Sequence, residues 1–215
     1  GDSTLTLTNQ LFGTSVAFLP DYLTGAPAPG IPAAFSEPAP VIMAPLAVNR
    51  EQSQKLTILA SRGERNTTIF DVSPFGGGPA FKVHSEYPAR ATVVTLANQT
   101  MHLVKFTPGI GTTSVAVTDH AGQKVAKIKL GMCNKLTAKL LSGELANTTY
   151  GVLGTPSTSE GYQLMGNHGA AFVAAPGLLE VKPGYDPTVM AILSVCMDLL
   201  SPERRDLSCW LCLPC

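Results

Sequence analysis

The chain has 215 residues and a formal net charge of +0, so it lacks the overall positive charge typical of nucleic-acid-binding proteins. Charged residues make up only 14% of it, against about 25% in ordinary globular proteins. The hydrophobic share of 45% excludes a highly charged disordered chain. No window of the sequence reaches the roughly 20 apolar residues that a helix needs to cross a bilayer.

The N-terminal part is dominated by proline. A high density of rings without N–H donors excludes a helix or a central strand over residues 20–46. We therefore predict a flexible Pro/Ala/Gly-rich arm over residues 1–49, and the alternative is a ligand for a proline-recognising domain. The prolines concerned are Pro20, Pro27, Pro29, Pro32, Pro38, Pro40 and Pro45.

From residue 56 the sequence changes to short runs rich in β-branched or alternating apolar residues, each closed by turn residues such as Gly76-Gly77-Gly78 or Pro108-Gly109. Strands spaced regularly without intervening helices predict an antiparallel meander, and twelve of them are too many for one flat sheet. The predicted strands are 56–60, 67–72, 79–84, 90–97, 100–107, 113–118, 124–130, 135–141, 149–153, 161–166, 170–175 and 178–182.

The last element is predicted to be a helix. Asp186 can cap it, and Pro187 suits the first helical position because the missing N–H costs nothing there. The following run, VMAILSVCMDLL, is apolar on nearly every side except at Ser194 and Asp198, which is typical of a buried helix. Since twelve strands leave a lumen too wide for their own side chains, we predict that this helix fills a closed antiparallel barrel.

Residues 178–200, LLEVKPGYDPTVMAILSVCMDLL, resemble the closing strand and central helix of the LURP-one-related family, within the tubby C-terminal-like superfamily. The matching positions are Val181, Pro183-Gly184, Asp186 and Asp198-Leu199. Two upstream runs are similar to the family's second and third strands, Ile69-Phe70-Asp71-Val72 and Phe81-Lys82-Val83.

The resemblance covers residues 50–201 and implies a twelve-stranded barrel around one hydrophobic helix. Relatives in the superfamily include phosphoinositide-binding tubby domains and phospholipid scramblases, so it also implies a lipid-related role. The chain departs from the family in residues 108–160, which are plainer and less charged than the family's basic, aromatic-rich middle, and in its long proline arm. These departures weaken the inference of a shared ligand more than that of a shared fold.

A lysine cluster is the first candidate site, in a stretch without acidic residues between positions 120 and 143. Alternation places Lys127 and Lys129 on one face of their strand, and a short turn would set Lys127 opposite Lys139 and Leu130 opposite Leu136. Like charges in such a pair are unfavourable, and an anion such as a phospholipid headgroup would relieve them; a solvated barrel face is the simpler explanation. The candidate headgroup residues are Lys127, Lys129, Lys135 and Lys139, with Lys124 nearby.

The C-terminal tail, residues 202–215, is the second candidate because it carries Cys209, Cys212 and Cys215. The simplest interpretation is an irregular tail with incidental thiols, and the functional one is acylation, which would anchor the chain to a membrane. Zinc binding would require a fourth ligand, and redox exchange would require a lowered thiol pKa.

No catalytic motif is recognisable, and the four histidines fall on separate strands or turns. Gly109-Ile110-Gly111 lacks the third glycine and the helix of a dinucleotide site. We therefore expect no enzyme activity, no cofactor and no metal.

The sequence thus predicts a barrel domain over residues 50–201, between the arm and the tail. We expect a non-catalytic module that binds anionic membrane lipids or acts as a membrane-proximal adaptor, and no nucleic-acid partner. The alternatives are a protein-interaction scaffold without a lipid ligand and scramblase-like transport, for which the helix is short. The few cysteines in the body favour the cytoplasm, although the sequons at Asn66, Asn98 and Asn147 point the other way.

Overall fold

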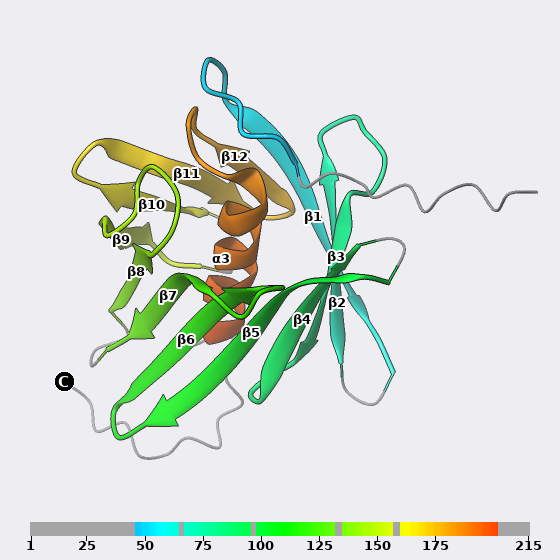
Figure 1. Ribbon diagram of the computed structural model, residues 1–215, viewed down its shortest axis with the longest axis vertical. Coiled ribbons are helices and arrows are strands. Elements are labelled where there is room, and N and C mark those ends of the chain that lie inside the picture. The colour runs from blue at the N-terminus through cyan, green and yellow to red at the C-terminus, as the bar shows by residue number, and fades with distance from the viewer. Residues whose placement is uncertain (1–45, 65–66, 96–97, 132–134, 157–159, 202–215) are drawn as a thin grey trace, which may run out of the picture. The chain divides into compact units, whose positions relative to one another are not determined.

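The computed structural model describes residues 46–64, 67–95, 98–131, 135–156 and 160–201. Over these ranges the chain forms twelve strands followed by one helix, α3 (Figure 1). The first six strands are β1 (Gln54–Arg62), β2 (Thr68–Pro74), β3 (Phe81–Glu86), β4 (Arg90–Thr95), β5 (Thr100–Gly109) and β6 (Thr112–Asp119). The others are β7 (Lys124–Leu130), β8 (Leu136–Leu140), β9 (Thr149–Gly154), β10 (Tyr162–Gly166), β11 (Gly169–Ala175) and β12 (Leu178–Val181), and α3 is Pro187–Leu200.

Each strand pairs antiparallel with the next one in the chain, and β1 pairs with β12 to close the ring. The closing contact sets Gln54 opposite Val181 and Thr57 opposite Leu178. The predicted closed barrel of twelve antiparallel strands is therefore confirmed, and the predicted strands lie within a few residues of the observed ones.

Strand alternation decides which side chains enter the barrel. In β3, for example, Phe81, Val83 and Ser85 are buried, whereas Lys82 and His84 between them are partly exposed. Most of the other strands show the same period of two, which is interrupted where the register shifts in β5, β7 and β11. Their buried side chains form one continuous apolar core with the helix.

Helix α3 lies inside this core, as Figure 1 shows, and every one of its residues except Asp198 is buried. It contacts β1, β7, β11 and β12. Because the strands surround it, an apolar stripe on one side would be insufficient, which explains the apolar residues on all of its faces. The prediction that the helix fills the barrel is confirmed.

One buried tyrosine joins the helix to the barrel wall. The Tyr162 hydroxyl on β10 lies 2.9 Å from Oγ of Ser194 and 3.1 Å from the Ser194 carbonyl oxygen, to which it donates. Its ring packs edge-on against Phe172 of β11, with centroids 5.8 Å apart. Burial raises the pKa of Tyr162 well above its usual value, so this hydroxyl stays protonated and serves as a structural donor.

The helix starts as the sequence predicts. Oδ1 of Asp186 accepts hydrogen bonds from the backbone N–H groups of Thr188, at 2.8 Å, and Val189, at 3.2 Å, and Pro187 occupies the first turn. These bonds satisfy two of the donors that a helix leaves free at its N-terminus.

We expect Asp186→Ala to lower the free energy of unfolding by about 1 kcal/mol, because it removes the cap of the central helix. Urea denaturation followed by circular dichroism measures the change. Asp186→Asn is the matched control, since an asparagine oxygen accepts the same bonds. An equal loss in both variants would contradict the cap as the cause and would point to the charge instead.

The segment before β1 also contacts the barrel. The backbone N–H of Gly184 donates to the Asn49 carbonyl oxygen at 2.8 Å, and Leu46 packs against the core. The proline arm up to residue 45 and the tail from residue 202 lie outside the described residues, and the predicted domain boundaries stay predictions.

Candidate functional site

Lysines gather on the outer surface of β7 and β8. Lys127 and Lys129 are exposed, and Lys139 on β8 is partly exposed. The register sets Lys127 opposite Lys139 and Leu130 opposite Leu136, which confirms the predicted strand pairing. Lys135 precedes β8 and is exposed. All four predicted lysines therefore belong to one stretch of surface, although Lys129 faces Thr137 and no second lysine.

Lys124 joins them because of an irregularity in the sheet. The register between β6 and β7 shifts so that Val117 faces Ala126 but Thr118 faces Lys124, which leaves Val125 as an extra residue. A bulge changes the side of the sheet on which the preceding side chain lies. Lys124 and Lys127 are therefore both exposed although they are three positions apart. The signal in the sequence is the doublet Val125-Ala126, where apolar residues stop alternating with polar ones.

One lysine of this surface, Lys105 on β5, is not among the residues predicted from the sequence. Lys105 faces Ala116 of β6, and Ala116 faces Lys127 of β7. Neighbouring strands are about 4.8 Å apart, so Lys105 and Lys127 start about 10 Å from each other with only a methyl group between them. Counting back from the turn at Gly109–Thr112 would have paired Lys105 with Ala116, because the hairpin has no bulge there.

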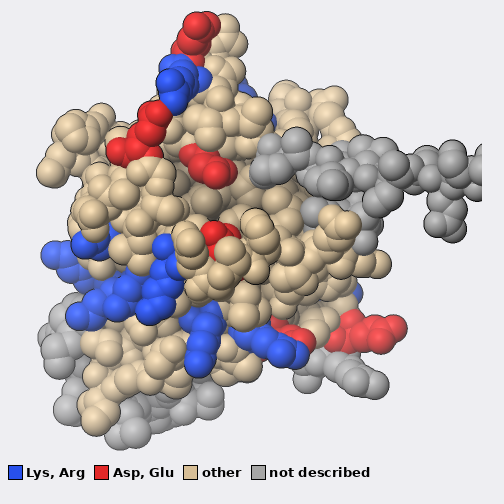
Figure 2. Space-filling view, in the orientation of Figure 1, with Lys and Arg blue, Asp and Glu red and all other residues tan. Residues whose placement is uncertain are grey.

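We call this surface the lysine face, and it consists of Lys105, Lys124, Lys127, Lys129, Lys135 and Lys139. Figure 2 shows the basic side chains over β7 and β8 as one continuous blue area. Between Arg90 and Gly143 the sequence contains one acidic residue, Asp119. The Asp119 carboxylate already accepts the N–H groups of Ala121 and Gln123 at its own turn.

Within the described ranges, no ion pair involves the lysine face. Ion pairs elsewhere on the barrel join Lys82 to Asp71, Arg90 to Glu86, Lys182 to Glu180 and Arg50 to Glu144. Arg90 is next to Lys105 in the sheet, but Glu86 binds it at 2.9 Å. The lysine face therefore keeps its positive charges side by side, an arrangement that attracts anions.

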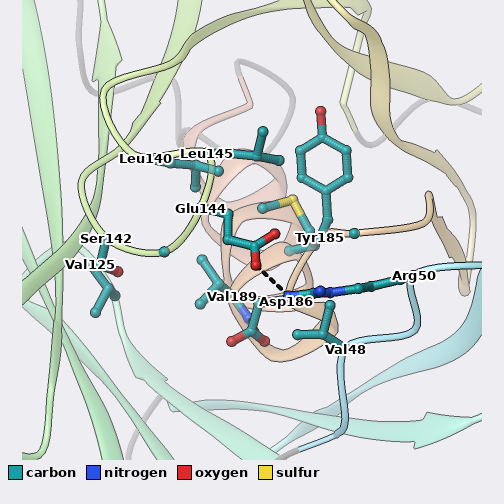
Figure 3. Close-up of a pocket in the computed structure, with 13 residues that line it drawn as sticks. Val48, Arg50, Val125, Leu140, Ser142, Glu144, Leu145, Tyr185, Asp186 and Val189 are labelled. Atoms are coloured by element: carbon teal, nitrogen blue, oxygen red, sulfur yellow. Dashed lines mark hydrogen bonds and ion pairs between the residues drawn. The ribbon is translucent and has the colours of Figure 1, made fainter.

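A pocket of about 250 Å³ opens where the helix begins (Figure 3). Arg50, from the segment before β1, reaches Glu144 on the β8–β9 connection, and the carboxylate of Asp186 lies beside this ion pair. The pocket's apolar walls are Val48, Val125, Leu140, Leu145, Val189 and Met190. Since Oδ1 of Asp186 is engaged in capping, the geometry gives this carboxylate a structural role.

The four histidines lie apart on β3, β5 and two turns, and Cys196 is buried in α3. Burial lowers the pKa of His102, which keeps its imidazole neutral near pH 7. Burial also raises the pKa of the Cys196 thiol in α3 to about 12, so this cysteine is a poor nucleophile. In the described part of the chain, His, Cys, Asp and Glu side chains nowhere gather in the groups of three that could hold a metal ion.

The predicted acylation residues Cys209, Cys212 and Cys215 lie outside the described residues, and their acylation stays a prediction. In the ranges that are described, no helix has both the length and the apolar character that crossing a membrane requires.

No family model matches the sequence, and no curated protein is similar to it in sequence. Among solved structures, the chain is similar to the X-ray structure of a protein from Arabidopsis thaliana, with a TM-score of 0.50 and 13% sequence identity. The match covers 74% of this chain and 96% of that protein. At such low identity the similarity concerns the fold alone.

Proposed function

We propose that this chain is a non-catalytic, tubby-like barrel module that binds the headgroups of anionic phospholipids through the lysine face. The observation that carries the proposal is a row of outward positions across four strands, Lys105, Ala116, Lys127 and Lys139, without a neighbouring carboxylate among the described residues. Membership of the LURP-one-related family is part of the proposal. The likeness in fold to the Arabidopsis protein is consistent with it.

The geometry of the row suits a phosphate group. Because the Ala116 side chain between them is small, Lys105 and Lys127 leave room for one anion, which both ammonium groups can approach from opposite sides. Lys139 lies directly beside Lys127 and adds a third charge. Long lysine side chains extend their charged ends into water while their stems rest on the sheet, which allows them to reach headgroups above a flat surface.

The test is co-sedimentation of the protein with phosphatidylcholine vesicles, with and without phosphatidylserine, at low and physiological salt. A lysine near an anionic surface contributes about 1 kcal/mol, so Lys127→Ala combined with Lys139→Ala is expected to weaken binding roughly thirtyfold at low salt. Binding should also fall as salt rises, because exposed charges are screened.

Lys55→Ala combined with Lys82→Ala is the matched control, since it removes the same charge from β1 and β3. Equal weakening in both double variants would mean that only net charge matters and would contradict a defined lysine face. Failure of the wild-type protein to bind anionic vesicles would refute the proposal. The second candidate, a protein-interaction scaffold without a lipid ligand, would then take its place.

Two further predictions belong to this proposal. A cytoplasmic, membrane-associated location fits a module that recognises anionic headgroups. Acylation of Cys209, Cys212 or Cys215 would supply the second membrane signal that stable anchoring requires.

A further inference from the structure

The turn between β5 and β6 presents an isoleucine that contributes nothing to the core. Gly109 faces Thr112, so the turn consists of Ile110 and Gly111. The exposed fraction of Ile110 is 105%, the highest among the exposed large hydrophobic residues of the described chain. Gly111 has a φ of +64°, which explains the glycine, but turn geometry does not require an isoleucine beside it. A polar residue would serve the turn better.

The register places this isoleucine at one end of the lysine face. Thr107 faces Ser114, and Ser114 faces Lys129, so Lys129 lies two residues from the last paired position of the hairpin. With a rise of about 3.4 Å per residue, the tip lies about 10 Å beyond the row that contains Lys129. In Figure 1 the β5–β6 hairpin extends past β7 at the lower edge of the barrel.

A second exposed apolar residue lies at the same end. Thr137 faces Gly151, and Leu153 follows two residues later on β9. Because β8 and β9 are antiparallel, Leu153 lies at the end of β9 that is next to the start of β8, where Lys135 is found. The exposed fraction of Leu153 is 62%. Asp119 lies at the opposite end of β6 from the hairpin tip, whereas Glu160 lies in the β9–β10 connection at the same end as Leu153. This end of the barrel therefore combines exposed apolar side chains with unpaired lysines.

We propose that the β5–β6 hairpin inserts Ile110 into the interface of an anionic lipid bilayer while the lysine face binds the headgroups around it. This inference rests on the proposed function and adds the inserting element and the orientation of the barrel. An apolar residue that enters about 5–10 Å into the interface, flanked by cations at headgroup level, is the arrangement by which amphipathic surfaces bind membranes. The offset between Ile110 and Lys129 matches that depth.

The first test compares Ile110→Ser with Phe75→Ser in binding to phosphatidylcholine vesicles that contain phosphatidylserine. Phe75 is a suitable control because it is also an exposed turn residue, at 67%, and follows the end of β2 away from the hairpin tip. Because Ile110→Ser removes the free energy gained when an isoleucine side chain leaves water, we expect it to bind about tenfold more weakly. This loss should be the same at low and at physiological salt. Phe75→Ser should bind like the wild type.

The outcomes separate this inference from the proposed function. Unchanged binding of Ile110→Ser, with weakened binding of the Lys127→Ala and Lys139→Ala double variant, would refute insertion and leave headgroup binding intact. Loss of affinity in Ile110→Ser at physiological salt, where the lysine contribution is screened, would support insertion. Absence of wild-type binding would refute both.

A fluorescence measurement tests insertion directly. Trp210 is the one tryptophan of the chain, so Ile110→Trp in a Trp210→Phe background reports on the hairpin tip alone. Its emission should shift to the blue and become quenchable by brominated lipids when vesicles are added. Phe75→Trp in the same background should not respond. An unchanged Ile110→Trp spectrum in protein that co-sediments with the vesicles would overturn the proposal.

Discussion

Leu193→Ala is expected to lower the free energy of unfolding by about 2–5 kcal/mol, towards the upper end of the range for buried leucines. Leu193 is fully buried in the middle of α3. The strands around it form a closed hydrogen-bonded ring, so they cannot move inward to refill the space that the variant creates. The cost of such a substitution grows with the cavity that remains.

Urea denaturation measures this loss as a shift of the unfolding midpoint, with the slope of the unfolding free energy against urea concentration unchanged. Leu59→Ala is the matched control, because Leu59 is 60% exposed on the outer surface of β1; its change should stay within about 0.5 kcal/mol. A loss below about 1 kcal/mol for Leu193→Ala would mean that the barrel can collapse around the helix.

Gly161→Ala is expected to be the second strongly destabilising substitution. Gly161 has a φ of +78°, and a Cβ at this position would lie 2.3 Å from the backbone oxygen of Ala174. Ala174 is fixed by its pairing with Tyr162 of β10. The left-handed backbone costs a residue with a Cβ about 1–2 kcal/mol, and the forced displacement adds about 1–3 kcal/mol.

Gly122→Ala separates these two contributions. Gly122 has the same φ of +78°, but a Cβ there would meet nothing within 4 Å. Thermal or urea denaturation should therefore show about 1–2 kcal/mol for Gly122→Ala and a clearly larger loss for Gly161→Ala. Equal losses of unfolding free energy in the two variants would show that β11 can move away from Gly161 without destabilising the barrel.

The two membrane proposals depend on different forces, and this difference makes them separable. Attraction between lysines and headgroups weakens over the Debye length, about 8 Å at physiological ionic strength. Burial of the Ile110 side chain depends on apolar area and is nearly independent of salt. A series of vesicle-binding measurements at increasing salt therefore isolates the contribution of the hairpin tip.

Local sequence was sufficient for the elements themselves. Period-two alternation and turn residues located the twelve strands, because both depend on neighbours within a few positions. Asp186 and Pro187 located the start of the helix for the same reason. The pairing of Lys127 with Lys139 was also predictable, since a short connection fixes the register of two adjacent strands.

Features that depend on the registers of several strands at once were decided by the tertiary structure. Lys105 became part of the lysine face through the intervening Ala116 of β6, and Lys124 through a bulge that breaks the alternation of β7. Ile110 lies at the same end as the lysines because of the combined registers of three strand pairs, β5–β6, β6–β7 and β7–β8. The sequence around residue 110 does not indicate this position.

The sequence by itself therefore determined the number and order of the strands, the apolar central helix and the Lys127–Lys139 pair, all of which arise from short-range patterns. Only the tertiary structure decided the register of the closing contact between β1 and β12, the full extent of the lysine face and the end of the barrel at which Ile110 projects. The physical reason is that side-chain period and turn chemistry act locally, whereas the closing pair joins strands distant in sequence and each row across the barrel depends on several registers at once.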